Sequence, residues 1–137
     1  MSMQLNPYFS FRDTAEEAMT FYLSAFGGEL SISRFEEYGA GADPAEQNKV
    51  MHAALTTDAG LVLMASDTPN GMDLSPGDNV SVSVGGDDEA ALRGYWEKLC
   101  DGGTVTMPLE PAPWGGLFGM CTDRYGIHWM ISVSDES

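Results

Sequence analysis

The sequence is short of positive charge. Lys and Arg number 6 against 21 Asp and Glu, which gives a formal net charge of −15. Nucleic acids and anionic membranes bind cationic surfaces, so we expect neither as a partner. Two explanations of the acidity stay open: solubility in an acidic proteome, or attraction of a cationic substrate.

Long apolar runs and cysteine motifs are also absent. No stretch approaches the ~20 apolar residues of a membrane span, and the N-terminus lacks a signal-peptide pattern. We therefore expect a soluble, cytoplasmic protein. The two cysteines, Cys100 and Cys121, form no CxxC motif, which excludes a cysteine-rich zinc site. We expect both in the core of a protein from a reducing compartment, with a catalytic Cys121 thiol as the alternative.

The sequence does contain an internal repeat, two copies of one supersecondary unit. A strand-like run at residues 8–11 precedes a helical stretch that stops at Gly27-Gly28, and a strand pattern restarts at Leu30. Roughly 75 residues later, a run at 80–84 precedes a second helical stretch that stops at Gly102-Gly103. Apolar residues recur at helical spacing in both stretches, namely Ala18, Phe21, Tyr22 and Ala25, then Leu92, Tyr95, Trp96 and Leu99.

The order of elements is βαβββ in each copy, which predicts two helices and about eight strands. A capping box at Thr14 and Glu17 and the pair Asp87-Asp88 mark the two helix starts. A length of 137 residues favours one domain: a first module at about 1–66, a connector at 67–78 and a second module at about 79–137. The expected strands are 5–11, 30–38, 50–57, 61–65, 80–84, one from 105 toward 113, 117–121 and 127–133; residues 39–48 are the main loop.

Four segments carry a recognisable combination: NPYFSF at 6–11, FYxxxFGGE at 21–29, WG with FG at 114–119, and DRYGIHW at 123–129. Together they resemble the vicinal oxygen chelate superfamily of glyoxalase I, extradiol dioxygenases and bleomycin- or fosfomycin-resistance proteins, and within it the PhnB-like branch. The resemblance implies an α+β fold of two βαβββ modules, with curved mixed sheets around a shared cavity. It also implies a homodimer.

Metal-dependent members of this superfamily hold a divalent ion with His and Glu side chains from the first and last strand of each module. Thioether and amide groups are poor ligands for Mg²⁺, Mn²⁺, Ni²⁺ or Zn²⁺. No position that corresponds to a ligand holds His or a carboxylate, so we expect neither a metal nor another cofactor. The positions are Asn6 or Pro7, Met64, Asn79 or Ser81, and Met130.

Two histidines are candidates for proton transfer. His128 precedes Met130 by two residues, so both side chains are expected on one face of the last strand. We predict His128 as the catalytic residue, a general base or a hydrogen-bond donor to ligand. The alternative is a strand-end histidine that bonds a backbone carbonyl. For His52, a structural or dimer-contact role is favoured over a catalytic one.

Aromatic residues and methionines suggest an apolar pocket. Trp114 and Phe118 lie among three glycines, which predicts an aromatic wall where backbone approaches a ligand; the alternative is a hairpin turn whose Trp covers the core edge. Arg124 could clamp an anionic group but is expected to pair with a carboxylate. Further cavity residues are expected to be Met64, Met72, Met107, Glu110, Met120 and Met130.

The leading prediction is a PhnB-like small-molecule-binding protein or metal-independent enzyme of undefined substrate, with Met64, Asn79, Trp114, Phe118 and Met130 binding the ligand. One alternative is a metal-dependent glyoxalase- or dioxygenase-type enzyme that uses His52, His128 or Glu110. Another is a dimer that sequesters a drug or metabolite without catalysis. Members of this branch are sometimes labelled demethylubiquinone methyltransferases, but the sequence has no G-x-G-x-x-G and predicts no nucleotide-type fold for S-adenosylmethionine.

Overall fold

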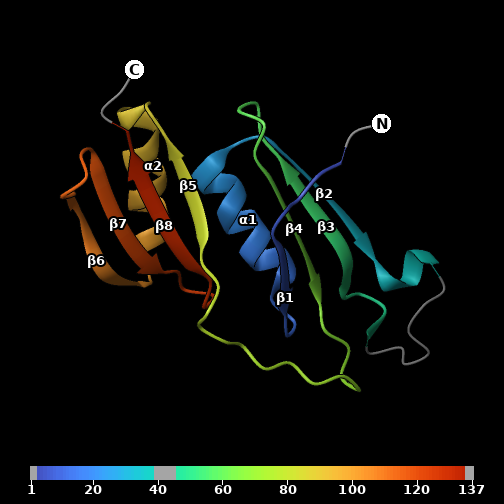
Figure 1. Cartoon of the computed structure of the whole chain (residues 1–137). Coiled ribbons are helices and arrows are strands. Elements are labelled where there is room, and N and C mark those ends of the chain that lie inside the picture. Colours follow the sequence, from blue (N-terminus) through green and yellow to red (C-terminus); the bar gives the residue numbers. More distant parts are fainter. Residues whose placement is uncertain (1–2, 39–45, 135–137) are drawn as a thin grey trace. The chain divides into compact units, whose positions relative to one another are not determined.

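The computed structural model describes residues 3–38 and 46–134. The chain divides into two compact units, Met1–Ser75 and Pro76–Ser137, and the boundary falls in the segment expected as a connector. Each unit contains a four-stranded mixed sheet with one helix against it (Figure 1). This confirms the predicted α+β class, whereas the grouping of both units into one domain stays a prediction.

The first unit has the sheet order β1-β4-β3-β2. Strands β1 and β4 are parallel, while β2–β3 and β3–β4 are antiparallel. Its elements in chain order are β1 (Tyr8–Phe11), α1 (Ala15–Phe26), β2 (Glu29–Arg34), the 3₁₀ turn η1 (Phe35–Tyr38), β3 (Val50–Thr56) and β4 (Val62–Asp67).

The second unit repeats this topology with the order β5-β8-β7-β6 and a parallel β5–β8 pair. Its elements are β5 (Val82–Gly86), α2 (Glu89–Cys100), β6 (Thr104–Pro111), β7 (Leu117–Thr122) and β8 (His128–Val133). The repeated βαβββ unit is therefore confirmed. Neither α-helix in the described part of the chain is long and apolar enough to cross a membrane.

Several element bounds differ from the sequence expectation. The first strand starts only at Tyr8, opposite Met64 of β4, and Leu5 is fully exposed. The second strand ends at Arg34, where the pairing with β3 shifts register and η1 follows. Strand β5 lies two residues later than expected because its glycines, up to Gly86, pair with the end of β8. Of the expected loop 39–48, residues 39–45 lie outside the described residues.

The core of each unit lies between the helix and one face of the sheet. In α1 the fully buried side chains are not the expected four but Ala15, Ala18, Met19 and Tyr22, whereas Phe21 and Ala25 are half-buried. The buried residues of α1 have the expected spacing but lie one turn closer to the N-terminus. The reason is that the backbone N–H of Ala15 is hydrogen-bonded to Asp67 of β4. In α2, Leu92 and Leu99 are buried and the two aromatic residues of the expected face are half-buried.

The paired glycines after each helix have two different tasks. Gly27 and Gly102 have φ of 75° and 80°, a left-handed conformation that ends a helix and favours glycine. The second glycine of each pair approaches the end of the third strand of its unit. A Cβ on Gly28 or Gly103 would lie 2.2 Å from the carbonyl oxygen of a threonine. The double glycine thus both turns the chain and lets it pass against the sheet.

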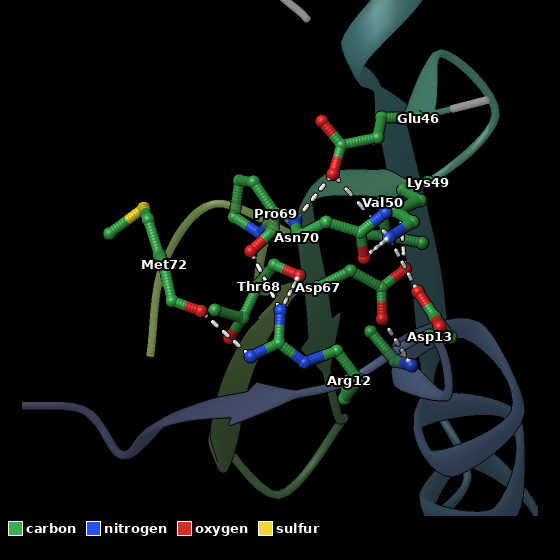
Figure 2. A network of polar contacts seen from close by, with 11 residues as sticks. Arg12, Asp13, Glu46, Lys49, Val50, Asp67, Thr68, Pro69, Asn70 and Met72 are labelled. Atoms are coloured by element: carbon green, nitrogen blue, oxygen red, sulfur yellow. Dashed lines mark hydrogen bonds and ion pairs between the residues drawn. The ribbon is translucent and has the colours of Figure 1, made fainter. Parts of the chain in front are cut away.

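The start of α1 is capped by a residue far away in sequence. Thr14 makes no side-chain cap hydrogen bond, so the expected capping box is wrong. Instead Asp67, at the end of β4, accepts hydrogen bonds from the backbone N–H of Ala15 and of Val50, both at 2.9 Å (Figure 2). Asp67 is only 5% exposed and joins the starts of α1 and β3 to β4. In α2 the expected cap is confirmed, since Asp88 accepts from Ala91 N–H at 3.1 Å.

Gly103 gives a test of the close approach. Its φ is not left-handed, so Gly103→Ala adds only a methyl group that overlaps the carbonyl oxygen of Thr122. We expect a loss of about 1–3 kcal/mol in the free energy of unfolding, measured by urea denaturation. Gly94→Ala, in α2 with nothing within 4 Å of the added carbon, should instead stabilise by about 0.5–1 kcal/mol. Equal effects of both variants would contradict this account.

Asp67→Asn tests the buried bridge. The amide keeps the shape of Asp67 but turns an NH₂ group toward one of the two backbone donors. We expect it to destabilise by about 2–4 kcal/mol, because a hydrogen bond to a charged acceptor is lost and a buried donor stays unsatisfied. The exposed Asp73→Asn removes the same charge and should change stability by less than about 0.5 kcal/mol. Equal urea midpoints for Asp67→Asn and Asp73→Asn would show that the hydrogen bonds of Asp67 do not stabilise the fold.

Candidate functional site

The face of the second sheet that points away from α2 carries three of the six predicted site residues. Alternate residues of β8 are buried toward the helix, and the others lie on the opposite face. His128 and Met130 belong to this open face, and so does Phe118, which pairs with Ser132. The buried residues of β8 are Trp129, Ile131 and Val133.

Three methionines form a row across this open face. Met130 of β8 lies opposite Met120 of β7, which lies opposite Met107 of β6, and Ser83 of β5 adjoins Met130 on the other side. Met130 and Met120 are half-buried and Met107 is exposed. Unbranched thioether side chains adapt to varied apolar shapes. The row can therefore form an apolar floor for a ligand.

A small hollow lies at one end of the second sheet. Trp114, 69% exposed, stands in the turn between β6 and β7, and its ring meets that of Phe118 edge-on, with centroids 5.4 Å apart. The hollow has a volume of about 140 Å³. Its lining consists of Met107, Pro108, Glu110, Pro111, Ala112, Pro113, Trp114 and Phe118. The structure thus brings Trp114 and Phe118 together as predicted, with Met107 and Glu110 beside them.

The glycines near Trp114 are each required by the turn or by the core. Gly115 and Gly116 have φ of 102° and 71° and form the turn, which the hydrogen bond from Ala112 N–H to the Gly116 carbonyl closes at 2.9 Å. Gly119 is buried, and a Cβ there would lie 2.9 Å from the ring of Trp96 in α2. Two of the three glycines therefore serve the turn and the third serves the core.

His128 is held by two contacts inside the protein. Its Nδ1 lies 2.9 Å from the Thr122 hydroxyl and its Nε2 lies 3.3 Å from the Gly77 carbonyl oxygen. A carbonyl only accepts, so Nε2 of the neutral ring carries the proton and Nδ1 accepts from Thr122. This geometry is that of the strand-end alternative. Proton transfer by His128 stays a prediction and requires one of these contacts to open.

His52 lies in the first unit, in contact with Tyr8. The Tyr8 hydroxyl is 3.3 Å from Nδ1 of His52, and the two ring centroids are 5.8 Å apart. Tyr8 also pairs in register with Met64, so Met64 lies on the same open face of the first sheet. Sequence reasoning missed this contact because the two residues are 44 positions apart. The alternation of the strands, once paired, is the only signal for it.

The predicted ligand-binding residues thus fall into separate groups. Trp114 and Phe118 share the hollow, and Met130 and His128 lie on the same sheet face as Phe118. Met64 belongs to the first unit. Asn79 lies before β5 rather than in it, and is exposed.

The residues at the centre of each open face do not fit a divalent metal. Met64 pairs with Tyr8 and Met130 pairs with Ser83, each across a parallel first and last strand. These side chains offer thioether and neutral hydroxyl groups, whereas hard divalent ions take carboxylate or imidazole ligands. Within residues 3–38 and 46–134, no three His, Cys, Asp or Glu side chains are grouped so that they could hold a metal ion.

A larger polar hollow of about 430 Å³ lies in the first unit, beside the start of α1. Its cations are already paired: Lys49 Nζ lies 2.7 Å from Asp13, and Arg34 lies 2.9 Å from Glu16 (Figure 2 for Lys49). The hydrogen bond from Lys49 to Asp13 raises the pKa of Lys49. Similarly, Arg124 pairs with Asp101 at 3.1 Å, as expected of it. These groups bind each other, which makes them poor candidates for ligand recognition.

The chain matches the family model described as 3-demethylubiquinone-9 3-methyltransferase over residues 3–132. The chain belongs to this family. A solved structure that shares this description and the name PhnB protein, from Bacillus cereus, is 28% identical with a TM-score of 0.73, and covers 96% of this chain and 100% of that one. Protein PA1353 from Pseudomonas aeruginosa is 34% identical, with a TM-score of 0.83 and coverage of 97% and 98%. The predicted PhnB-like branch is therefore confirmed.

The fold extends to the wider superfamily. A glyoxylase/bleomycin resistance protein/dioxygenase domain from Frankia is 18% identical, has a TM-score of 0.66 and covers 98% of each chain. At this identity the likeness shows the fold alone. It agrees with the two βαβββ units of this PhnB-like chain.

The two cysteines of this PhnB-like chain lie together at the helix–sheet contact of the second unit. Cys121 is buried and Cys100 half-buried. Burial, followed by the neighbouring Cys100, raises the pKa of the Cys121 thiol to about 12. Because the thiolate is the nucleophile, this environment argues against the catalytic role that was the alternative for Cys121.

Alkylation tests this assignment. At pH 8, about one Cys121 thiol in ten thousand is ionised if its pKa is about 12. Iodoacetamide should therefore leave Cys121 of the native protein unmodified at pH 8, as read by peptide mass spectrometry, and labelling should accelerate as the pH rises. Labelling in urea supplies the control, since both thiols then react. Rapid native labelling of Cys121 at pH 8 would overturn the assignment.

Proposed function

We propose that this PhnB-like chain is a small-molecule-binding protein that works without a resident divalent metal. The observation that carries the proposal is the pair of methionines at the centres of the open sheet faces. Met64 and Met130 occupy equivalent register positions beside the first strand of each unit. Apolar thioethers stand where metal-dependent members of the superfamily need charged or imidazole ligands.

The second unit supports a ligand with an apolar part. The row of Met130, Met120 and Met107 leads across the sheet toward the hollow of Trp114 and Phe118. Ligand sites are predominantly apolar and aromatic with few polar groups. A volume of about 140 Å³ is below the ~300 Å³ of a complete ligand pocket, so the hollow would hold one portion of a ligand.

Methyl transfer is not part of the proposal, although the family description and the Bacillus cereus structure carry that name. A methyltransferase of this kind would need a site for S-adenosylmethionine. The sequence has no G-x-G-x-x-G, and each described sheet is a small mixed sheet with a helix on one face rather than a doubly wound parallel sheet.

Binding without chemistry and metal-free catalysis are both compatible with this proposal. His128 would be the proton-transfer residue in the catalytic version, with the Thr122 or Gly77 contact opening when substrate binds. The specific observation that favours simple binding is that both of its ring nitrogens already have partners. A homodimer, which the resemblance implies, is compatible with either version.

A thermal-shift experiment tests the proposal. Protein purified without a metal-binding tag is heated with EDTA, or with excess Mn²⁺, Ni²⁺ or Zn²⁺, each with and without a panel of metabolites and antibiotics. We expect the metals alone to move the melting temperature by less than about 1 °C, since a held ion at 100 times its Kd would add about 2.7 kcal/mol. Stabilising compounds should act equally in EDTA.

Met130→Lys serves as the matched variant, because a charge in the methionine row should abolish stabilisation by an apolar compound, while Met3→Lys, at a residue that is 99% exposed, should not. A melting temperature raised by several degrees with one metal, together with stoichiometric metal after dialysis, would contradict the proposal. So would compounds that stabilise only when metal is present.

A further inference from the structure

The hollow beside Trp114 contains one uncompensated charge. Of its eight lining residues only Glu110 is ionisable. Glu110 is exposed, and its side chain makes no hydrogen bond or ion pair with any other residue in the part of the chain that the structure describes. In contrast, none of the three cations of this unit lines the hollow: Arg93 binds Glu89 at 2.8 Å, Arg124 binds Asp101 at 3.1 Å, and Lys98 lies in the last turn of α2. A ligand in the hollow therefore meets a free carboxylate with no protein cation beside it.

The aromatic rings add a second attraction for positive charge. Trp114 and Phe118 meet at an interplanar angle of 69°, so their faces point in different directions around the hollow. The faces of aromatic rings are negative, and Trp is the strongest partner for a cation held over its ring. Glu110 of β6 pairs in register with Phe118 of β7, so the two residues are cross-strand neighbours. Both aromatic residues and Glu110 thus line one small hollow.

The walls of the hollow are rigid and its size is limited. Pro108, Pro111 and Pro113 line it, and proline fixes the backbone φ angle. Such a wall loses little freedom when a ligand binds. The volume of about 140 Å³ equals the share of roughly five water molecules. That space suits a compact head group rather than a whole drug-sized molecule.

From this geometry we infer that the hollow of Glu110, Trp114 and Phe118 is a subsite for an organic cation, a compact alkylammonium group with apolar substituents. A bare metal ion would leave the rings and prolines without contacts, and a neutral group would leave the carboxylate unused. The net charge of −15 would also favour the approach of a cation. The inference rests on the proposed function, because the rest of such a ligand would extend toward the methionine row.

The test uses choline as probe and 3,3-dimethylbutan-1-ol as its uncharged counterpart of the same shape. Binding is followed in ¹H–¹⁵N spectra through the indole N–H signals of the three tryptophans. Trp129 donates its indole N–H to buried Asp123 at 2.8 Å and serves as an internal reference that should not move. The Trp114 signal is assigned from a Trp114→Phe variant.

We expect choline to shift the Trp114 signal with a Kd about tenfold lower than that of the alcohol, from a cation–π contact and an exposed ion pair together. Glu110→Gln should weaken choline binding about fivefold and leave the alcohol unchanged. Glu97→Gln, on the exposed side of α2, removes the same charge and should leave both affinities within twofold.

The contrary results separate this inference from the proposed function. Equal affinities for choline and the alcohol at Trp114 would overturn the cation subsite but leave small-molecule binding intact. Equal losses in Glu97→Gln and Glu110→Gln would also overturn it, since net charge alone would then explain the preference. If neither probe moves Trp114 while the thermal-shift panel yields ligands, the subsite is wrong and the ligand binds elsewhere. If both experiments are negative, both proposals fail.

Discussion

Pairing between the first and last strand of each unit is the interaction on which the rest of this structure depends. In both units the chain leaves its first strand, forms a helix and three further strands, and then lies parallel beside that first strand. This pairing places the last strand inside the sheet, with a neighbour on each side. Met64 and Met130 consequently stand at the middle of their sheets, which is why the proposed function rests on these two positions.

The two units reach this common topology by different polar contacts. In the first unit Asp67 supplies the acceptor for the start of α1 from the end of β4. In the second unit Asp88 caps α2 from the position immediately before the helix, and buried Asp123 instead accepts from Trp129 and from the turn at Tyr125. What both units share is the glycine that passes against the third strand, at Gly28 and Gly103. A steric requirement is thus common to both units, while the hydrogen bonds around it differ.

Local patterns in the sequence were sufficient for the fold and insufficient for the site. Helical spacing, the Gly-Gly stops and the residues around the hairpins depend on near neighbours, so the βαβββ order could be predicted. The sequence places Asp67 in the connector, because nothing near it in sequence shows that it accepts from Ala15 and Val50. The partners of His128 could not be predicted for the same reason, since Gly77 lies 51 residues away. The shared cavity and the homodimer stay predictions.

The placement of charge links the composition to the candidate site. An acidic surface by itself says little about function, because most of its carboxylates face water or pair with the few cations, as Glu16 does with Arg34. Glu110 differs in its surroundings, since it stands among prolines, a methionine and two aromatic rings. A carboxylate in such a place lowers the affinity of an apolar hollow for neutral ligands and raises it only for cationic ones. Its position beside Trp114, rather than the total charge, is therefore the feature that argues for recognition.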